Sequence, residues 1–154
     1  MSERFFDERQ TVYSFNGDTL VRCPQCEGSA RSARIDSSNL DWFAPRRLTC
    51  LNCGHVNTWS NKQISRGWRD AHDDYFELPL WLQTECCGAT LWAYNVDHLD
   101  FIERFVRAEL RERTEDAERG WMNASLASRL PHWLKAAKNR AKILRAIEAL
   151  RRRP

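Results

Sequence analysis

The sequence predicts an α+β fold in which a small metal-binding β-module precedes a second β-hairpin and two long C-terminal helices. Three observations predict it. Two Cys-x-x-Cys pairs lie among short β-prone runs before residue 60, two apolar runs flank a glycine-containing turn near residue 87, and apolar residues recur at helical spacing after Val96. We therefore divide the chain into a metal module at 1–60, a connector at 61–77 and a hairpin plus helical region at 78–154.

The strongest motif is formed by four cysteines, Cys23, Cys26, Cys50 and Cys53, whose two pairs are separated by 23 residues. A two-residue gap lets both sulfurs of a tight turn point at one ion, about 2.3 Å from each. Four thiolates close the coordination sphere of zinc and leave no position for water. The spacing therefore predicts one structural Zn²⁺ held by all four cysteines.

A thiol oxidoreductase that uses Cys23 and Cys26 is the alternative, because Cys23-Pro24-Gln25-Cys26 looks like the active-site dithiol of glutaredoxin-type proteins. Such a dithiol has a low thiol pKa because it lies at a helix N-terminus. Gly28 is a poor residue for a first helical turn, and redox chemistry leaves the second cysteine pair unexplained. Zinc requires both pairs, so it is the favoured interpretation.

Short strands are predicted around these cysteines. A turn at Asn16-Gly17 indicates a hairpin that leads through a strand at 20–22 into the first cysteine pair. Residues 30–35 and 40–49 flank a polar turn and form an antiparallel pair, with Pro45 at an edge or a bulge. Residues 55–59 add a third strand, which completes a three-stranded antiparallel sheet.

With two cysteine turns and this sheet, residues 20–60 resemble the zinc-ribbon superfamily, including the transcription-factor-IIB type. The resemblance rests on Cys23-Pro24-x-Cys26 and on Cys50-x-x-Cys53-Gly54. It implies a ribbon fold with a bound metal and, often, nucleic-acid or protein binding. The run from Leu80 to Asn95 is similar to part of small bacterial zinc-ribbon proteins that have no established activity.

The connector at 61–77 is polar, and its acidic residues Asp70, Asp73 and Asp74 are predicted to form a solvated loop because their spacing fits no calcium loop. A second hairpin is predicted from the apolar runs at 78–84 and 89–94.

Cys86 and Cys87 lie in the turn of that hairpin and are adjacent, so they cannot chelate one zinc as a Cys-x-x-Cys turn does. They are predicted to be turn and core cysteines. A second metal site with His72 or His98, and a reactive thiol, remain as alternatives.

Helices are predicted for most of the remaining chain. The first begins near Asp97 and runs to about Thr114, and a short one follows at 123–129. The last begins at Pro131, a favoured first-turn residue, and runs to about Arg151. The first helix has one apolar face, made by Leu99, Ile102, Phe105, Val106 and Leu110.

Charge is distributed unevenly along the chain. The formal net charge is +3, yet residues 120–154 carry nine basic side chains and a single acidic one, Glu148. Nucleic acid is therefore the first predicted partner, bound in a salt-dependent way with little sequence specificity. The predicted contacts are three lysines of the last helix and four arginines of the metal module: Lys135, Lys138, Lys142, Arg31, Arg34, Arg46 and Arg47.

A protein-interaction adaptor, with Trp42 and Trp68 as anchors, is the other binding hypothesis. No catalytic triad or phosphate-binding glycine motif stands out, so the sequence favours binding over catalysis. No apolar run long enough to cross a membrane is present, and the metal-type cysteine spacing without an export signal favours the cytoplasm.

Arg140 departs from the pattern of its helix, because helical projection places it between Trp133 and Ile147 in the apolar stripe. It either extends to water or forms an ion pair that fixes how the two helices dock. We predict the ion pair, with a carboxylate of the preceding helix from among Asp97, Asp100 and Glu103.

Overall fold

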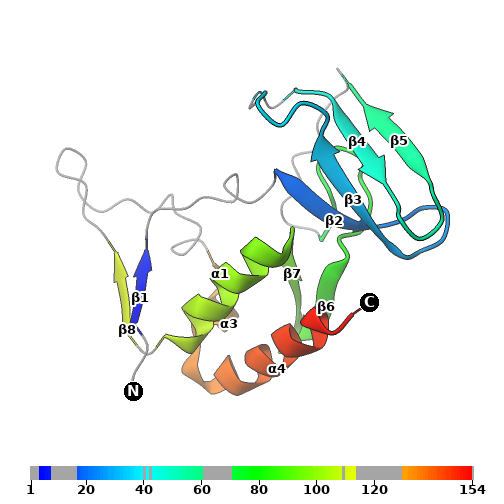
Figure 1. Ribbon diagram of the computed structural model, residues 1–154. Coiled ribbons are helices and arrows are strands. Elements are labelled where there is room, and N and C mark those ends of the chain that lie inside the picture. The colour runs from blue at the N-terminus through cyan, green and yellow to red at the C-terminus, as the bar shows by residue number, and fades with distance from the viewer. Residues whose placement is uncertain are drawn as a thin grey trace, which may run out of the picture. The chain divides into compact units, whose positions relative to one another are not determined.

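The computed structural model describes residues 4–7, 17–39, 41, 43–60, 71–108, 110–113 and 130–153 (Figure 1). The predicted α+β class is confirmed: these residues form a four-stranded antiparallel sheet, two two-stranded sheets and several helices. They belong to two compact units. The sheet unit comprises 16–83 and 92–95, and the helical unit comprises 1–15, 84–91 and 96–153. This grouping assigns residues 71–83 to the sheet, whereas the sequence division separated them from it.

The sheet contains β2 (Asp18–Arg22), β3 (Ser29–Arg34), β4 (Arg46–Thr49) and β5 (Val56–Trp59), hydrogen-bonded in that order and antiparallel throughout. It has one strand more than predicted, because the strand leading into the first cysteine turn pairs with β3 along its whole length. One cysteine turn joins β2 to β3 and the other joins β4 to β5. Since β3 and β4 are antiparallel, both turns lie at the same edge of the sheet (Figure 1).

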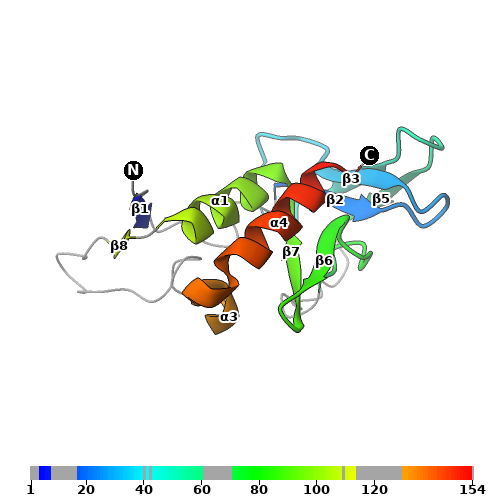
Figure 2. The ribbon, with the colours of Figure 1, turned by 90° about the horizontal axis from the view of Figure 1, so that it is seen from below.

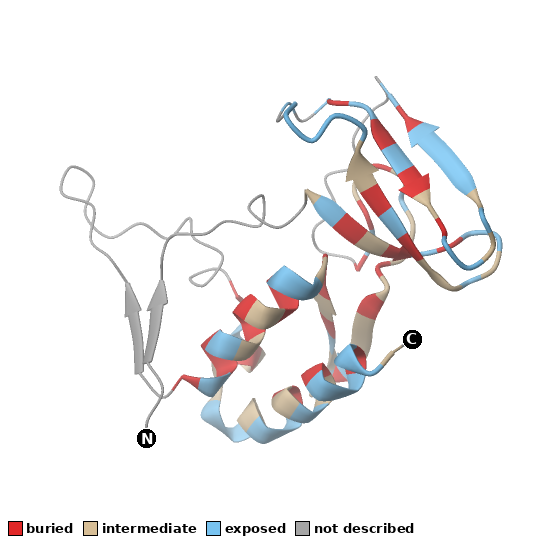
Figure 3. Ribbon diagram, in the orientation of Figure 1, coloured by how far each residue is buried: buried red, intermediate tan, exposed pale blue. Residues whose placement is uncertain are grey.

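Alternation along the strands decides which side chains enter the core of the sheet unit. Ala30 and Ser32 of β3 are buried, whereas Arg31 between them is exposed. In β4 the buried positions are Arg46 and Leu48, and Arg47 is exposed (Figure 3). Side chains two residues apart point to the same face of a strand, so Arg46 shares the core face with Leu48.

The free edge of β2 is covered by main-chain hydrogen bonds from later segments of the same unit. The Leu20 amide donates to the Tyr94 carbonyl at 2.8 Å, and the Arg22 amide donates to the Pro79 carbonyl at 2.8 Å. The Trp81 amide returns a bond to the Leu20 carbonyl at 2.9 Å. An edge strand with unpaired amides is a template for aggregation, so this cover protects the sheet on the β2 side.

Arg46 was predicted to contact phosphate, and its position contradicts that prediction. Its side chain is 1% exposed. The guanidinium carbon lies 3.9 Å from the ring centroid of Tyr75, and Nη1 donates to the Gly17 carbonyl at 3.2 Å. Trp59 packs edge-on against the same Tyr75 ring, with centroids 4.8 Å apart. Arg46 is therefore a core residue that stacks on an aromatic ring instead of facing a ligand.

Asp73 lies in this region and is not the solvated loop residue that was predicted. It is 3% exposed, and one carboxylate oxygen accepts hydrogen bonds from the backbone amides of Tyr75 at 3.2 Å and Phe76 at 2.6 Å. Burial raises the pKa of Asp73, whereas these amides and the charge of Arg46 oppose the rise. Asp73 thus closes a turn that delivers Tyr75 into the core.

The predicted second hairpin is present as β6 (Leu82–Cys86) and β7 (Ala89–Ala93). Its first strand lies later than the predicted run at 78–84, so Cys86 ends β6 and only Cys87 and Gly88 form the turn. In the helical unit, α1 (Val96–Arg107) packs against α4 (Arg140–Arg151). Figures 1 and 2 show the two helices side by side. The buried apolar residues of the two helices include Leu99, Ile102, Phe105, Val106, Ile143, Ile147 and Leu150.

The helix predicted to reach Thr114 is shorter, because α1 ends at Arg107. The chain continues into β8 (Leu110–Arg113), which pairs in parallel with β1 (Arg4–Asp7). This pairing joins residues more than a hundred positions apart, and local periodicity carries no information about it.

The last helix is also interrupted. It consists of α3 (His132–Lys135), the 3-10 turn η2 (Ala137–Asn139) and α4. Ala136 has an extended backbone, with φ −76° and ψ 123°, and the Asn139 side chain donates to the Trp133 carbonyl at 3.0 Å. That bond satisfies a carbonyl that the break would otherwise leave unpaired. The predicted long last helix is therefore replaced by two shorter helices and a 3-10 turn.

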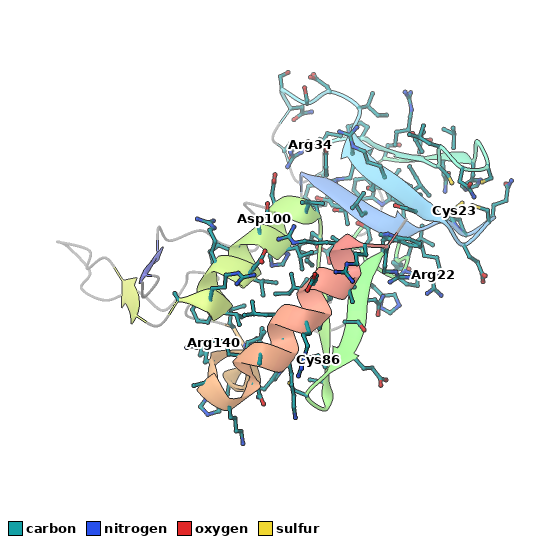
Figure 4. All side chains as sticks on the ribbon, turned by 60° about the horizontal axis from the view of Figure 1, so that its bottom comes forward. Arg22, Cys23, Arg34, Cys86, Asp100 and Arg140 are labelled. Atoms are coloured by element: carbon teal, nitrogen blue, oxygen red, sulfur yellow. The ribbon has the colours of Figure 1, made fainter. Side chains whose placement is uncertain are left out.

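The ion pair predicted for Arg140 is made by a different residue. Arg151 donates to Asp100 and Glu103 of α1, each at 2.5 Å. Arg140 begins α4 and lies eleven residues before Arg151, which is about 16 Å along the helix axis. Figure 4 shows Arg140 at the end of the helix pair that is far from Asp100. Arg140 is half-buried, and its Nε is buried without a hydrogen-bond partner.

Several expectations fall outside the described residues. These are the first strand of the N-terminal hairpin, Trp42, Trp68, Asp70 and the short helix at 123–129. Among the residues that are described, no helix has the length and apolar character needed to cross a membrane.

The buried position of Arg46 gives a stability prediction. Arg46→Ala should lower the free energy of unfolding by about 3 kcal/mol, because it removes a desolvated cation–π contact and leaves partners of the guanidinium unsatisfied. Arg46→Lys should not restore it, since lysine lacks the planar group that stacks on Tyr75. Arg47→Ala, on the exposed face of the same strand, is the control and should change stability little. Urea unfolding followed by tryptophan fluorescence measures all three, and equal effects at the two positions would contradict this account.

The Arg151 contacts predict a pH-dependent contribution. Partial burial raises the pKa of Glu103, but hydrogen bonds from Arg151 and Arg107 outweigh it, so the pKa lies below its usual value. A lowered pKa in the folded state stabilises the protein above the unfolded-state value of about 4.3, and this stabilisation is lost as pH falls through the folded-state pKa. Arg151→Gln should therefore lower the free energy of unfolding by about 1 kcal/mol near neutral pH, and this loss should disappear once the pH falls below the folded-state pKa of Glu103.

Arg152→Gln is the matched control for this measurement. Arg152 pairs with Glu148 on the same helix, and both side chains are more than half exposed. An exposed pair of this kind contributes little, so this variant should resemble the unmodified protein at every pH. A pH-independent loss in Arg151→Gln would mean that its packing matters and its charge does not.

Candidate metal centre

The two cysteine turns have the same backbone construction. In each, the amide of the first cysteine donates to the carbonyl five residues later: Cys23 to Gly28 at 2.7 Å, and Cys50 to His55 at 2.9 Å. In both turns, the amide of the residue four positions after the first cysteine donates to the carbonyl of that cysteine at 2.9 Å. That residue has a positive φ in each case, 64° at Glu27 and 79° at Gly54. Glycine adopts this conformation readily, so Gly54 fits the turn without strain, whereas Glu27 does not.

This shared construction brings four sulfurs together at one edge of the sheet. The Sγ atoms of Cys23 and Cys53 lie 3.6 Å apart, as do those of Cys26 and Cys50, and all four lie within 4.8 Å of one another. All four thiols are free. Four sulfurs placed tetrahedrally at 2.3 Å from one zinc ion would lie about 3.8 Å apart. The donor set and its spacing therefore fit a metal ion of this type.

Hydrogen bonds to the sulfurs hold the first turn in the form that a metal needs. The Gln25 amide donates to Cys23 Sγ at 3.4 Å, and the Gly28 amide donates to Cys26 Sγ at 3.4 Å. Asn52, from the second turn, donates its side-chain amide to Cys26 Sγ at 3.3 Å. A Cβ on Gly28 would lie 3.3 Å from the Asn52 amide nitrogen and 3.4 Å from Cys26 Sγ, so a larger residue would disturb this bond.

The four thiols influence one another's ionisation. Hydrogen bonds from Asn52 and Gly28 lower the pKa of Cys26 to about 6. A backbone hydrogen bond from His55 lowers the pKa of Cys53, but burial and the neighbouring cysteines raise it, to about 12. Four negative sulfurs at this spacing repel one another, so all four can be thiolates only when a cation lies among them. The arrangement thus favours a divalent ion.

Asn52 and Glu27 were not identified from the sequence. The Asn52 contact follows from the way the two turns face each other, which the spacing of the cysteines does not reveal. Glu27 could have been recognised, because it occupies the place in the first turn that Gly54 occupies in the second.

The arginines predicted to bind nucleic acid have four different environments. Arg46 is buried, as described above. Arg31 is exposed but forms an ion pair with Asp18, and the Nε of the half-buried Arg34 is buried without a hydrogen-bond partner. Arg47 is exposed. They do not form one exposed basic surface.

Two of the three predicted lysines are exposed, and the third lies before the break in the last helix. Lys138 of η2 and Lys142 of α4 are exposed, whereas Lys135 precedes the break at Ala136 and is half-buried. Arg145 is exposed one turn beyond Lys142. It was missing from the predicted contacts, although its spacing of three from Lys142 places it on the same face.

Among the described residues, the four cysteines are the only group of three or more potential metal ligands within reach of one ion. The structure therefore gives no support to a second metal site that joins Cys86 or Cys87 to a histidine. His98 is buried on α1, where burial lowers its pKa to about 4.

Comparison of the chain with protein-family models, curated proteins and solved structures finds no match.

The cysteine cluster predicts one zinc ion per chain. Cys→Ser at Cys23, Cys26, Cys50 or Cys53 should release the metal and loosen the four-stranded sheet, because metal binding and folding are coupled in such sites. Elemental analysis of purified protein and circular dichroism after chelation measure the two effects. Cys86→Ser and Cys87→Ser serve as controls and should keep the metal. Loss of metal from either control, or full retention in a cluster variant, would contradict the assignment.

Proposed function

We propose that this chain is a zinc-ribbon protein whose function is to bind nucleic acid without catalysing a reaction. The observation that carries the first part is the convergence of four free cysteine sulfurs, from two similar turns, at one edge of an antiparallel sheet. Such a site lacks an open coordination position, so the zinc would be structural. Its role is to hold the two turns, and with them the four strands, in one arrangement.

The nucleic-acid part of the proposal rests on a basic stripe formed by Lys138, Lys142 and Arg145. These side chains are exposed at spacings of four and three residues, and no ion pair neutralises them within the described chain. By contrast, Arg107, Arg151 and Arg152 in the same unit are paired with carboxylates. Unpaired cations at regular spacing suit a phosphate backbone, whose counterions they displace.

In the sheet unit, Arg47 is the predicted arginine best able to add to this interaction, because it is exposed and has no described ion pair. Arg31 would have to give up Asp18, and Arg46 could reach a phosphate only if the core opened. The helical stripe is therefore the principal surface in this proposal.

Redox chemistry at Cys23 and Cys26 is the less favoured activity. A catalytic dithiol needs one accessible sulfur that forms a mixed disulfide. Cys23 is fully buried and Cys26 is half-buried, and both sulfurs lie within one cluster of four cysteines, where a metal ion would hold them. The lowered pKa of Cys26 suits a metal ligand equally well, since a ligating cysteine is a thiolate.

A protein-binding role is the second candidate function. The supporting observation is Leu51, which is 95% exposed at the tip of the second cysteine turn, with the exposed Val56 at the start of the strand that follows. Exposed apolar side chains on a rigid turn can anchor a partner protein.

The basic stripe gives a binding prediction. Lys138→Gln with Lys142→Gln should weaken binding to single- and double-stranded oligonucleotides of mixed sequence roughly tenfold at low salt, and should flatten the dependence of affinity on salt. Fluorescence anisotropy across a salt series measures both. Arg107→Gln with Arg152→Gln removes the same charge from paired positions and should retain most of the affinity. Equal loss in both variants would show that net charge alone matters.

Capture of partners from cell lysate, with and without nuclease, separates the two binding functions. Partners that disappear after nuclease treatment support nucleic-acid binding. A protein partner that survives nuclease and high salt supports the second candidate instead.

A further inference from the structure

The adjacent cysteines Cys86 and Cys87 lie outside the metal centre, at the tip of the β6–β7 hairpin in the helical unit. Their Sγ atoms are 3.4 Å apart. Cys86 is the last residue of β6, and Figure 4 shows it on this hairpin. The question is what brings two neighbouring thiols together.

Ordinary strand geometry would keep them apart, because successive side chains of a strand point to opposite faces. Cys87 departs from that geometry, with φ 57°, and Gly88 follows with φ 78°. Positive φ at both central residues of a two-residue hairpin turn is characteristic of type I′. The left-handed conformation at Cys87 turns its side chain away from the strand alternation, toward that of Cys86.

Cysteine is an unusual residue at that position. Type I′ turns favour Asn, Asp or Gly at the first central residue, since these tolerate the left-handed region. A side chain without that tolerance is conformationally strained there, and strain of this kind is concentrated at functional positions. Gly88 already satisfies the second position, so turn formation alone does not explain Cys87.

The two thiols also differ in access. Cys86 is 9% exposed, and burial raises its pKa to about 11, with Cys87 adding to the rise and the Lys142 ammonium opposing it. Cys87 is half-buried. A hollow of about 340 Å³ is lined by the turn itself: Glu85, Cys86, Cys87, Gly88, Ala89 and Thr90. A small oxidant fits such a space, since one water occupies about 30 Å³ of liquid.

We propose that Cys86 and Cys87 are a reversible oxidation site, at which a peroxide converts the two thiols into a disulfide between adjacent residues. The more accessible Cys87 sulfur attacks the peroxide oxygen, which forms a sulfenic acid and releases water. The Cys86 sulfur then attacks the sulfenic acid sulfur of Cys87 and displaces its hydroxide. The hydroxide takes the Cys86 thiol proton and leaves as a second water. Two thiols and one hydrogen peroxide thus give one disulfide and two waters. A dithiol reductant reverses the change by thiol–disulfide exchange.

The metal centre offers a contrast within the same chain. A bound zinc ion would draw one lone pair from each of its four sulfurs and so lower their nucleophilicity, whereas the described residues hold no metal-ligand cluster at Cys86 and Cys87. A mild peroxide should therefore reach the hairpin pair first. This order of reaction distinguishes a dedicated site from general thiol oxidation.

The test uses the zinc-loaded full chain and stoichiometric hydrogen peroxide at neutral pH. After quenching, alkylation and proteolysis, mass spectrometry should find the hairpin peptide lighter by two hydrogen atoms and resistant to alkylation. Treatment with dithiothreitol before alkylation should restore two labelled cysteines. Zinc content should stay unchanged during the reaction.

Cys87→Asn is the matched control, because it places the favoured Asn-Gly pair in the turn and removes one thiol. This variant should unfold at an equal or higher temperature and should form no disulfide within the hairpin. Cys86→Ala removes the other thiol and should leave Cys87 to oxidise further, to a sulfinic acid.

Two results would overturn the proposal. One is release of zinc with oxidation of the cluster cysteines while both hairpin thiols still react fully with the alkylating reagent. The other is oxidation of Cys87 alone in the unmodified chain, with Cys86 still free.

Discussion

The constraint on which the sheet unit depends is the meeting of four cysteine sulfurs at one edge of a small sheet. Two similar turns supply them, and each turn begins where one strand ends and finishes where the next begins. The pairing of β3 with β4 then decides that both turns lie at the same edge. Ionised thiols at this spacing repel one another, so folding at this edge of the sheet is coupled to the binding of a cation.

The remaining core of the sheet unit is small and relies on an unusual set of residues. Arg46 occupies a position that its strand neighbour Leu48 would suggest for an aliphatic side chain. It is accommodated because Tyr75 offers a ring face, Gly17 a carbonyl and Asp73 a nearby negative charge. Residues after 70 therefore complete the core, which is why the region behaves as part of the sheet unit although its composition resembles a linker.

How much of this could be read from the sequence depends on how local the signal is. The cysteine spacing, the second hairpin and the start of α1 at Val96 were predictable because each is set within a few residues. The end of α1 was not, because the pairing of β8 with β1 competes with the helix from a distant part of the chain. Arg46 was misplaced by residue type, although period-two alternation with Leu48 contained the correct answer.

Arg140 and Arg151 illustrate a related limit. Helical projection led to an ion pair predicted for Arg140, and that prediction is wrong, because Arg151 makes the pair with α1. Which cation makes the pair depends on where the helices cross along their lengths. The last turn of α4, and not its first, lies against Asp100 and Glu103.

The six cysteines are brought together by two different backbone geometries. In the sheet unit, two residues separate each pair, and the resulting turns aim four sulfurs at a common point. In the hairpin no residue separates Cys86 from Cys87, and with Cys87 in the left-handed conformation the two sulfurs lie 3.4 Å apart. Each cysteine turn of the metal centre also carries a residue with positive φ, Glu27 in the first turn and Gly54 in the second. This left-handed residue bends the backbone of the turn so that the cysteine sulfurs can approach one another.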